Sequence, residues 1–120
     1  MKHHRQLWVK VNVLVDRSIK DLITALSLFP KLQTIESCQG NNNNSAWVSF
    51  YYGKNGQYSW KELANFIFKY FGPRLAKEVG DRVDLHIRVS ENGQIFGELF
   101  VRKKALPVVT KAIIKLSQNY

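Results

Sequence analysis

The stretch RVDLHIRVSENGQIFGELFVR, residues 82–102, decides the fold because two alternating segments flank a strong turn signal. In residues 82–89 apolar and polar side chains alternate strictly, which is typical of a β-strand with one buried face. Glu91-Asn92-Gly93 follows, and type I′ turns favour the Asn-Gly pair. The sequence therefore predicts a hairpin whose second strand covers residues 94–102.

Three more segments have strand character. Residues 32–39 and 46–53 predict a second hairpin, joined by the polar loop GNNNNS, since Gly and Asn tolerate the backbone conformations of turns. Residues 7–15 alternate with period two and carry valines on one side, which predicts a half-buried strand. The chain is therefore expected to build one antiparallel sheet.

Helical patterns separate and follow these strands. The first predicted helix begins at Ser18 and stops before Pro30, the second begins at Ser59 and breaks or kinks at Gly72-Pro73, and the third begins near Pro107. The resulting order is βαββαββα, and its first six elements are those of a ferredoxin-like two-layer sandwich. We therefore expect an α+β fold with strand order 2-3-1-4-5 and helices mainly on one face.

Length and composition narrow the class of protein. A chain of 120 residues, 45% hydrophobic and 22% charged, is expected to form a single α+β domain over residues 1–120. Its one cysteine, Cys38, excludes an internal disulfide and suits a reducing compartment. No stretch reaches the roughly 18 apolar residues of a membrane span, and the N-terminal segment lacks a signal-peptide pattern. We expect a cytoplasmic protein without a membrane partner.

The charge balance favours anionic partners. Lys and Arg number 18 against nine Asp and Glu, giving a formal net charge of +9. This sign attracts nucleic acid or an acidic protein surface. The nearest thing to a basic cluster is Arg102-Lys103-Lys104, and a run of three is typical of a solvated strand end. A mildly basic surface and a dedicated anion-binding face both stay open.

One face of the predicted sheet is unusually aromatic. If the valines of residues 7–15 and 82–89 face the core, alternation assigns the opposite face, which in an ordinary solvated sheet is mostly polar. We expect something to cover it: the C-terminal helix, a second copy in a homodimer packed sheet against sheet, or a ligand or nucleic acid. The residues assigned to this face are Trp8, Lys10, Asn12, Leu14, Trp47, Ser49, Tyr51, Asp84, His86, Arg88, Phe96, Glu98 and Phe100.

Eight of these residues are candidates for ligand or partner binding. They combine aromatic rings with charged side chains, a mixture that suits binding of a partner through an open sheet face. The candidates are Trp8, Lys10, Trp47, Tyr51, Asp84, His86, Arg88 and Phe96. A small binding or assembly module with an unidentified ligand is the function we expect first.

A second function rests on a resemblance. Residues 7–10, Leu-Trp-Val-Lys, resemble the strand-one motif of RNA-recognition motifs, and residues 46–50, Ala-Trp-Val-Ser-Phe, resemble the second half of their strand-three motif. Asn43 and Ser45 stand where that motif has a basic and an aromatic residue. The resemblance implies single-stranded RNA or DNA stacked on Trp8 and Trp47, with Lys10 and Arg88 near phosphates.

A third possibility is a small enzyme centred on Asp84, His86 and Arg88. These side chains share one face at two-residue spacing, so they could hold an anion or move a proton. Alternating charges on a strand are also typical of surface pairs, here with Glu98 across the hairpin. We assign no catalytic residue, cofactor or metal ligand, since the chain has no phosphate-binding loop, dinucleotide fingerprint or zinc-site spacing.

Cys38 and His86 are the other pair that could be catalytic, because a thiolate needs a base nearby. In the expected order their strands lie three spacings apart, roughly 14 Å, whereas a hydrogen bond needs about 3 Å. The sequence therefore predicts that Cys38 is a small packing residue.

Overall fold

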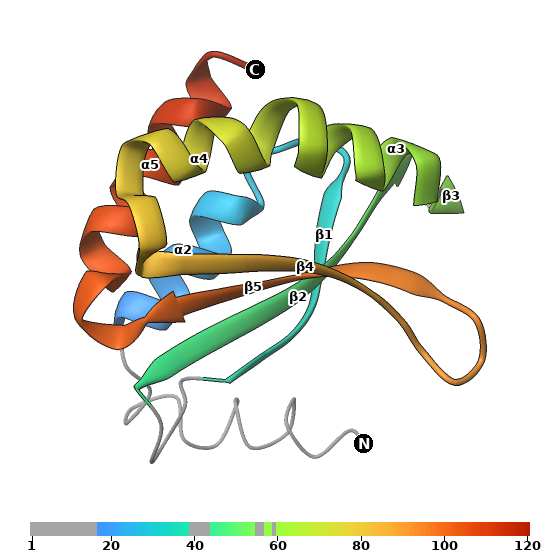
Figure 1. Ribbon diagram of the computed structural model, residues 1–120, viewed down its shortest axis with the longest axis horizontal. Helices are drawn as coiled ribbons and strands as arrows, with labels where there is room; N and C mark the ends of the chain where they lie inside the picture. The colour runs from blue at the N-terminus through green and yellow to red at the C-terminus, as the bar shows by residue number, and fades with distance from the viewer. Residues whose placement is uncertain (1–16, 39–43, 55–56, 59) are drawn as a thin grey trace.

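The computed structural model describes residues 17–38, 44–54, 57–58 and 60–120. Figure 1 shows a mixed α+β architecture in which helices pack on an antiparallel sheet. In chain order the elements are α2 (Arg17–Leu26), β1 (Leu32–Cys38), β2 (Ser45–Lys54), β3 (Gln57–Tyr58), α3 (Trp60–Asn65), η1 (Phe66–Phe71), α4 (Gly72–Val79), η2 (Gly80–Arg82), β4 (Val83–Val89), β5 (Ile95–Arg102), η3 (Lys103–Ala105) and α5 (Leu106–Gln118).

The predicted strands at 32–39, 46–53, 82–89 and 94–102 are confirmed to within one residue at each end. The hairpin between β4 and β5 is confirmed as well. Its turn is longer than two residues, since Ser90 N donates to Gln94 O at 2.8 Å and Gly93 takes a positive φ of 86°. The strand predicted at 7–15, with Trp8 and Lys10, lies outside the described residues.

The strand order differs from the ferredoxin-like expectation. The strands follow the order β1-β2-β5-β4, and the short β3 pairs with β2. In the expected order 2-3-1-4-5, the segments at residues 46–53 and 94–102 are the third and fifth strands and are not neighbours. In the structure these segments are β2 and β5, and they pair directly from Ser45↔Arg102 to Phe50↔Gly97, so the expected order is wrong for the described strands. Leu99 and Val101 of β5, which lies inside the sheet, are buried, whereas β4 at its border is more exposed.

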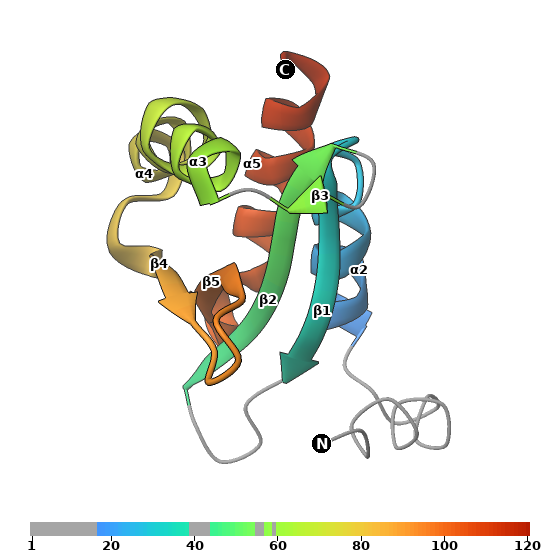
Figure 2. The ribbon, with the colours of Figure 1, turned by 90° about the vertical axis from the view of Figure 1, so that its right-hand side faces the viewer.

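All described helices pack on the same face of the sheet (Figure 2). β2 contributes Ala46, Val48, Phe50 and Tyr52 to the core, and α5 lies between α2 and α4 on that side. The apolar stripe of α5, which includes Val109, is buried there. The C-terminal helix therefore does not cover the aromatic face, and that sequence-based alternative is wrong.

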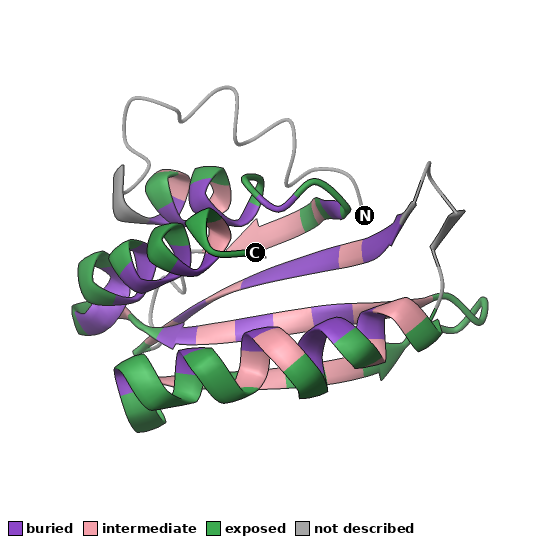
Figure 3. Cartoon of the chain, turned by 90° about the horizontal axis from the view of Figure 1, so that it is seen from above, coloured by how far each residue is buried: buried purple, intermediate pink, exposed green. Residues whose placement is uncertain are grey.

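The second helix continues through the predicted break at Gly72-Pro73. In Figure 1, α3, η1 and α4 form one long helical rod, and Figure 3 shows buried and exposed residues alternating along it. A π-helical turn makes this possible: Gly72 N donates to Ile67 O, and a Cβ at position 72 would lie only 2.4 Å from that oxygen. Pro73 offers no N–H, and Arg74 Nη1 instead donates to Lys69 O at 3.3 Å. Gly72 and the side chain of Arg74 thus allow the helix to continue where the sequence predicted a break or kink.

Aromatic rings fill the core where the long helix, β2 and the end of α5 meet. Tyr52 stacks on Phe66 with ring centroids 4.3 Å apart, and Phe66 also contacts Phe71 and Phe29. The hydroxyl groups of Tyr52 and Tyr120 share a hydrogen bond. Burial, followed by this hydrogen bond, raises the pKa of Tyr52 above the usual value of tyrosine. The neutral phenol is therefore the form that the fold favours.

No helix in the described part of the chain has both the length and the apolar character needed to cross a membrane.

Candidate functional site

The candidate site is the sheet face opposite the helices, here called the open sheet face. The strand registers place the described residues predicted for this face side by side, as alternation required. Two cross-strand rows are clear, one joining Trp47 to Phe100 and one joining Ser49 to Glu98. None of the described helices lies on it. The open sheet face consists of Gln33, Glu36 and Cys38 on β1, Trp47, Ser49 and Tyr51 on β2, Phe96, Glu98, Phe100 and Arg102 on β5, and Asp84, His86 and Arg88 on β4.

The aromatic part of this face is half-buried. Trp47 lies across from Phe100, and Phe96 lies across from Arg88. Tyr51 donates its hydroxyl hydrogen to Gln94 Oε1, which links β2 to the start of β5. Rings in this state still expose apolar surface that a partner could remove from water.

Polar groups occupy the middle of the face. Ser49 is 4% exposed and donates to Glu36 O at 3.4 Å. Glu98 lies opposite Ser49, and its carboxylate accepts a hydrogen bond from Arg88 Nη1 at 3.1 Å. The side chain of Glu98 is 13% exposed and that of Arg88 is 58% exposed. The ion pair is therefore anchored on the sheet and open to water at its cationic end.

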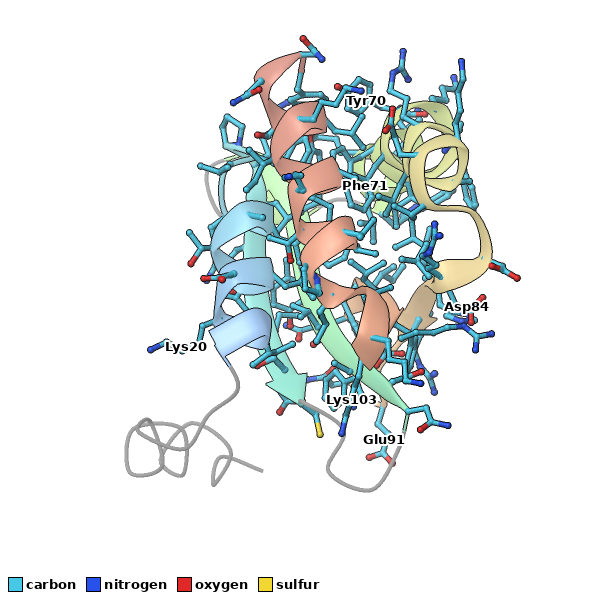
Figure 4. The ribbon with its side chains drawn as sticks, turned by 90° about the vertical axis from the view of Figure 1, so that its left-hand side faces the viewer. Lys20, Tyr70, Phe71, Asp84, Glu91 and Lys103 are labelled. Atoms are coloured by element: carbon cyan, nitrogen blue, oxygen red, sulfur yellow. The ribbon has the colours of Figure 1, made fainter. Side chains whose placement is uncertain are left out.

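Asp84, His86 and Arg88 lie along the border strand and are all exposed. The His86 ring meets the edge of Phe100 at 90°, with centroids 5.5 Å apart. Arg88 is occupied by Glu98, as the cross-hairpin pairing predicted. Figure 4 shows Asp84 on the outside of the molecule, beside the segment that joins α4 to β4. Successive residues on one strand face point the same way, so these groups form a row and do not converge on one atom.

Cys38 lies on the open sheet face, which the sequence did not predict. A bulge in β1 shifts the register between Thr34 and Glu36, so that Glu36 pairs with Ser49 and Cys38 with Trp47. An extra residue reverses the alternation of every later side chain, and Glu36 thus joins the face as well. Cys38 is half-buried there and remains three strands from His86, roughly 14 Å away. A thiol–imidazole hydrogen bond between these two residues is excluded.

The described residues contain no group of three or more His, Cys, Asp or Glu side chains placed to hold a metal ion. Comparison with protein-family models, with curated proteins and with solved structures gave no match.

Proposed function

We propose that the chain is a small binding module that holds a polypeptide partner on the open sheet face. The observation that supports this proposal is the set of half-buried rings, Trp47, Tyr51, Phe96 and Phe100, on a face that none of the described helices covers. Aromatic residues and arginine are enriched where proteins bind one another. Two aromatic regions flank a polar centre, so a partner would bury rings while keeping Glu98 and Arg88 paired.

The charges of the face favour polypeptide over nucleic acid. Its acidic residues are Glu36, Asp84 and Glu98, and its cationic ones are Arg88 and Arg102. Phosphate groups need a surplus of Lys and Arg, which this face lacks although the whole chain carries +9. The RNA-recognition resemblance also depends on a central strand at residues 7–15, and β5 takes the position beside β2. Nucleic acid is thus the weaker alternative.

The enzyme alternative has less support still. A general acid–base pair must reach a common reacting atom. Asp84, His86 and Arg88 point out from a border strand, and Arg88 is already bound to Glu98.

Site-specific photocrosslinking inside the cells that produce the protein tests the proposal. The photoreactive residue p-benzoylphenylalanine replaces Trp47 or Phe96 on the open sheet face, or Val108, which is 51% exposed on α5, as the matched control. We expect discrete protein adducts from the two face positions and none from position 108. A Phe100→Glu substitution should remove those adducts, because it places a charge beside position 47 on the open sheet face.

Each other outcome would favour a different partner or contradict the proposal. Adducts that nuclease removes would favour nucleic acid, and an adduct of twice the chain mass would favour a second copy. Equal labelling at all three positions, or none at positions 47 and 96, would contradict the proposal. Tryptophan fluorescence during titration with a single-stranded RNA at low salt should stay unchanged.

A further inference from the structure

The border strand β4 has a backbone edge that no other described strand pairs with. β4 is last in the order β1-β2-β5-β4, and its seven residues pair with β5 alone among the described strands. Figure 2 shows it at the side of the sheet away from β1. It contains neither proline nor, in its register with β5, a bulge. Such an edge is a template for another strand.

The hairpin geometry shows which amides point outward. Ser90 N donates to Gln94 O at 2.8 Å, so the pair Ser90–Gln94 is hydrogen-bonded. Bonded and non-bonded pairs alternate along an antiparallel ladder. Asp84, His86 and Arg88 therefore direct their N–H and C=O groups to β5. Val83, Leu85, Ile87 and Val89 direct theirs away from the sheet.

β4 is complementary to itself when it is reversed. An antiparallel pair of two β4 strands with its two-fold axis at His86 sets Leu85 opposite Ile87 and Val83 opposite Val89 of the second copy. All four of these residues have outward amides, so they form the hydrogen-bonded pairs and make about eight bonds between the strands. The pairing would also cover Val89, which is 65% exposed. The outward backbone groups and the apolar side chains therefore favour the same register.

The charges select the same register. Asp84 lies opposite Arg88 of the second copy, and Arg88 lies opposite Asp84 of the second copy, at non-hydrogen-bonded positions where side chains approach most closely. Moving the two-fold axis to Leu85 or to Ile87 would set His86 opposite Asp84 or Arg88 and end both ion pairs. A guanidinium has five donors, so Arg88 can hold Glu98 and the new carboxylate together.

We propose that β4 binds β4 of a second copy of this chain, forming one continuous sheet through a two-fold axis at His86. The surface is the strand edge, so it is distinct from the open sheet face. The two open sheet faces would lie side by side on one surface of the dimer, where both remain available to a partner.

A charge swap tests the pairing directly. Sedimentation analysis of the full chain should show a dimer that dissociates on dilution. Arg88→Asp sets two carboxylates opposite each other, and Asp84→Arg sets two guanidinium groups opposite each other, so each should raise the dissociation constant at least about tenfold. The double variant D84R/R88D restores unlike pairs and should recover most of the affinity. Glu98→Gln removes the internal ion pair of Arg88 alone and should leave the dimer intact.

Amide exchange and one distance identify the interface. Protection of the Leu85 and Ile87 amides should rise with protein concentration, while the amides of Asp84, His86 and Arg88 stay protected throughout by β5. A spin label on the single cysteine, Cys38, should report a separation of roughly 34 Å, seven strand spacings across the continuous sheet.

Several results would overturn the proposal. They are a monomer at millimolar concentration, a dimer that Arg88→Asp does not weaken, or a double variant that fails to recover. A dimer with labels much closer than 34 Å would indicate packing of one open sheet face on another. The crosslinking at Trp47 and Phe96 is scored independently, so failure of the edge pairing leaves the proposed function standing, and the reverse also holds.

Discussion

On the helix side of β2, Val48 and Phe50 have no exposed surface, whereas Trp47 and Tyr51 on the other side are half-buried. All four side chains are largely apolar, so their chemistry does not explain the difference. The helices of the described residues cover one face of the sheet and not the other. The comparison teaches that rings on the covered face stabilise the fold, while rings on the open sheet face keep apolar surface that none of the described helices covers. Substitutions on the two faces should therefore differ in what they damage.

The largest contrast is expected between two neighbouring residues, Phe50 and Tyr51. Phe50→Ala removes a fully buried ring and should lower the free energy of unfolding by about 3–5 kcal/mol. Tyr51→Ala removes a half-buried ring and the hydrogen bond to Gln94, with an expected loss of about 1 kcal/mol. Urea denaturation of both variants measures the difference. Equal losses would mean that both faces belong to one core.

Gly97 provides a smaller test of the covered face. It lies opposite Phe50, and a Cβ at this position would be 2.6 Å from the tip of that ring. Because the ring is enclosed, Gly97→Ala should cost about 1–3 kcal/mol by overpacking. Shortening the ring in Phe50→Leu should offset part of that cost, so the double variant should be more stable than the sum of the single losses predicts. Strict additivity in the double-mutant cycle would contradict the contact.

Tyr52, on the covered face, should make the free energy of unfolding depend on pH in the alkaline range. Its pKa is raised by burial, so above about pH 10 the unfolded chain loses this proton before the folded chain does. The free energy of unfolding should therefore fall as pH rises through this range. Tyr52→Phe should lose about 1 kcal/mol at pH 7 and show a flatter alkaline dependence. Chemical denaturation from pH 7 to about pH 11 measures both effects.

Tyr120→Phe is the matched control for Tyr52. It removes the same hydrogen bond but leaves the Tyr52 phenol buried, and burial is the larger cause of the raised pKa. Most of the alkaline slope should remain in this variant. An unchanged slope in Tyr52→Phe would show that another group controls the alkaline transition.

Local sequence patterns predicted the strands and the faces of the described sheet well. Alternation in residues 46–53 and 82–102 was enough to separate Phe50 from Tyr51 and Leu85 from His86, because side-chain direction follows directly from strand geometry. The two faces of a strand can therefore be assigned from its own residues, without knowing which strands lie beside it.

The strand order and the location of α5 could not be predicted in this way. They depend on which apolar surfaces meet across the whole chain, and the ferredoxin-like expectation was wrong where β5 pairs with β2. The bulge at Ile35 was also invisible, because one unpaired residue between Thr34 and Glu36 leaves no composition signal. It brought Cys38 and Glu36 to the open sheet face, and the candidate site grew in consequence.

The smallest effect is expected for the ion pair on the open sheet face. Glu98→Gln breaks the contact with Arg88, whose side chain is 58% exposed, so the free energy of unfolding should fall by less than about 1 kcal/mol. Salt at about 1 M should reduce the difference, because water and ions screen an exposed charge. Glu62→Gln breaks the exposed pair with Lys31 and serves as the control. If Glu98→Gln costs more than about 2 kcal/mol and salt does not reduce that cost, the carboxylate behaves as a buried charge. The open sheet face would then stabilise the fold as the core does, and the difference proposed between the two faces of the sheet would be contradicted.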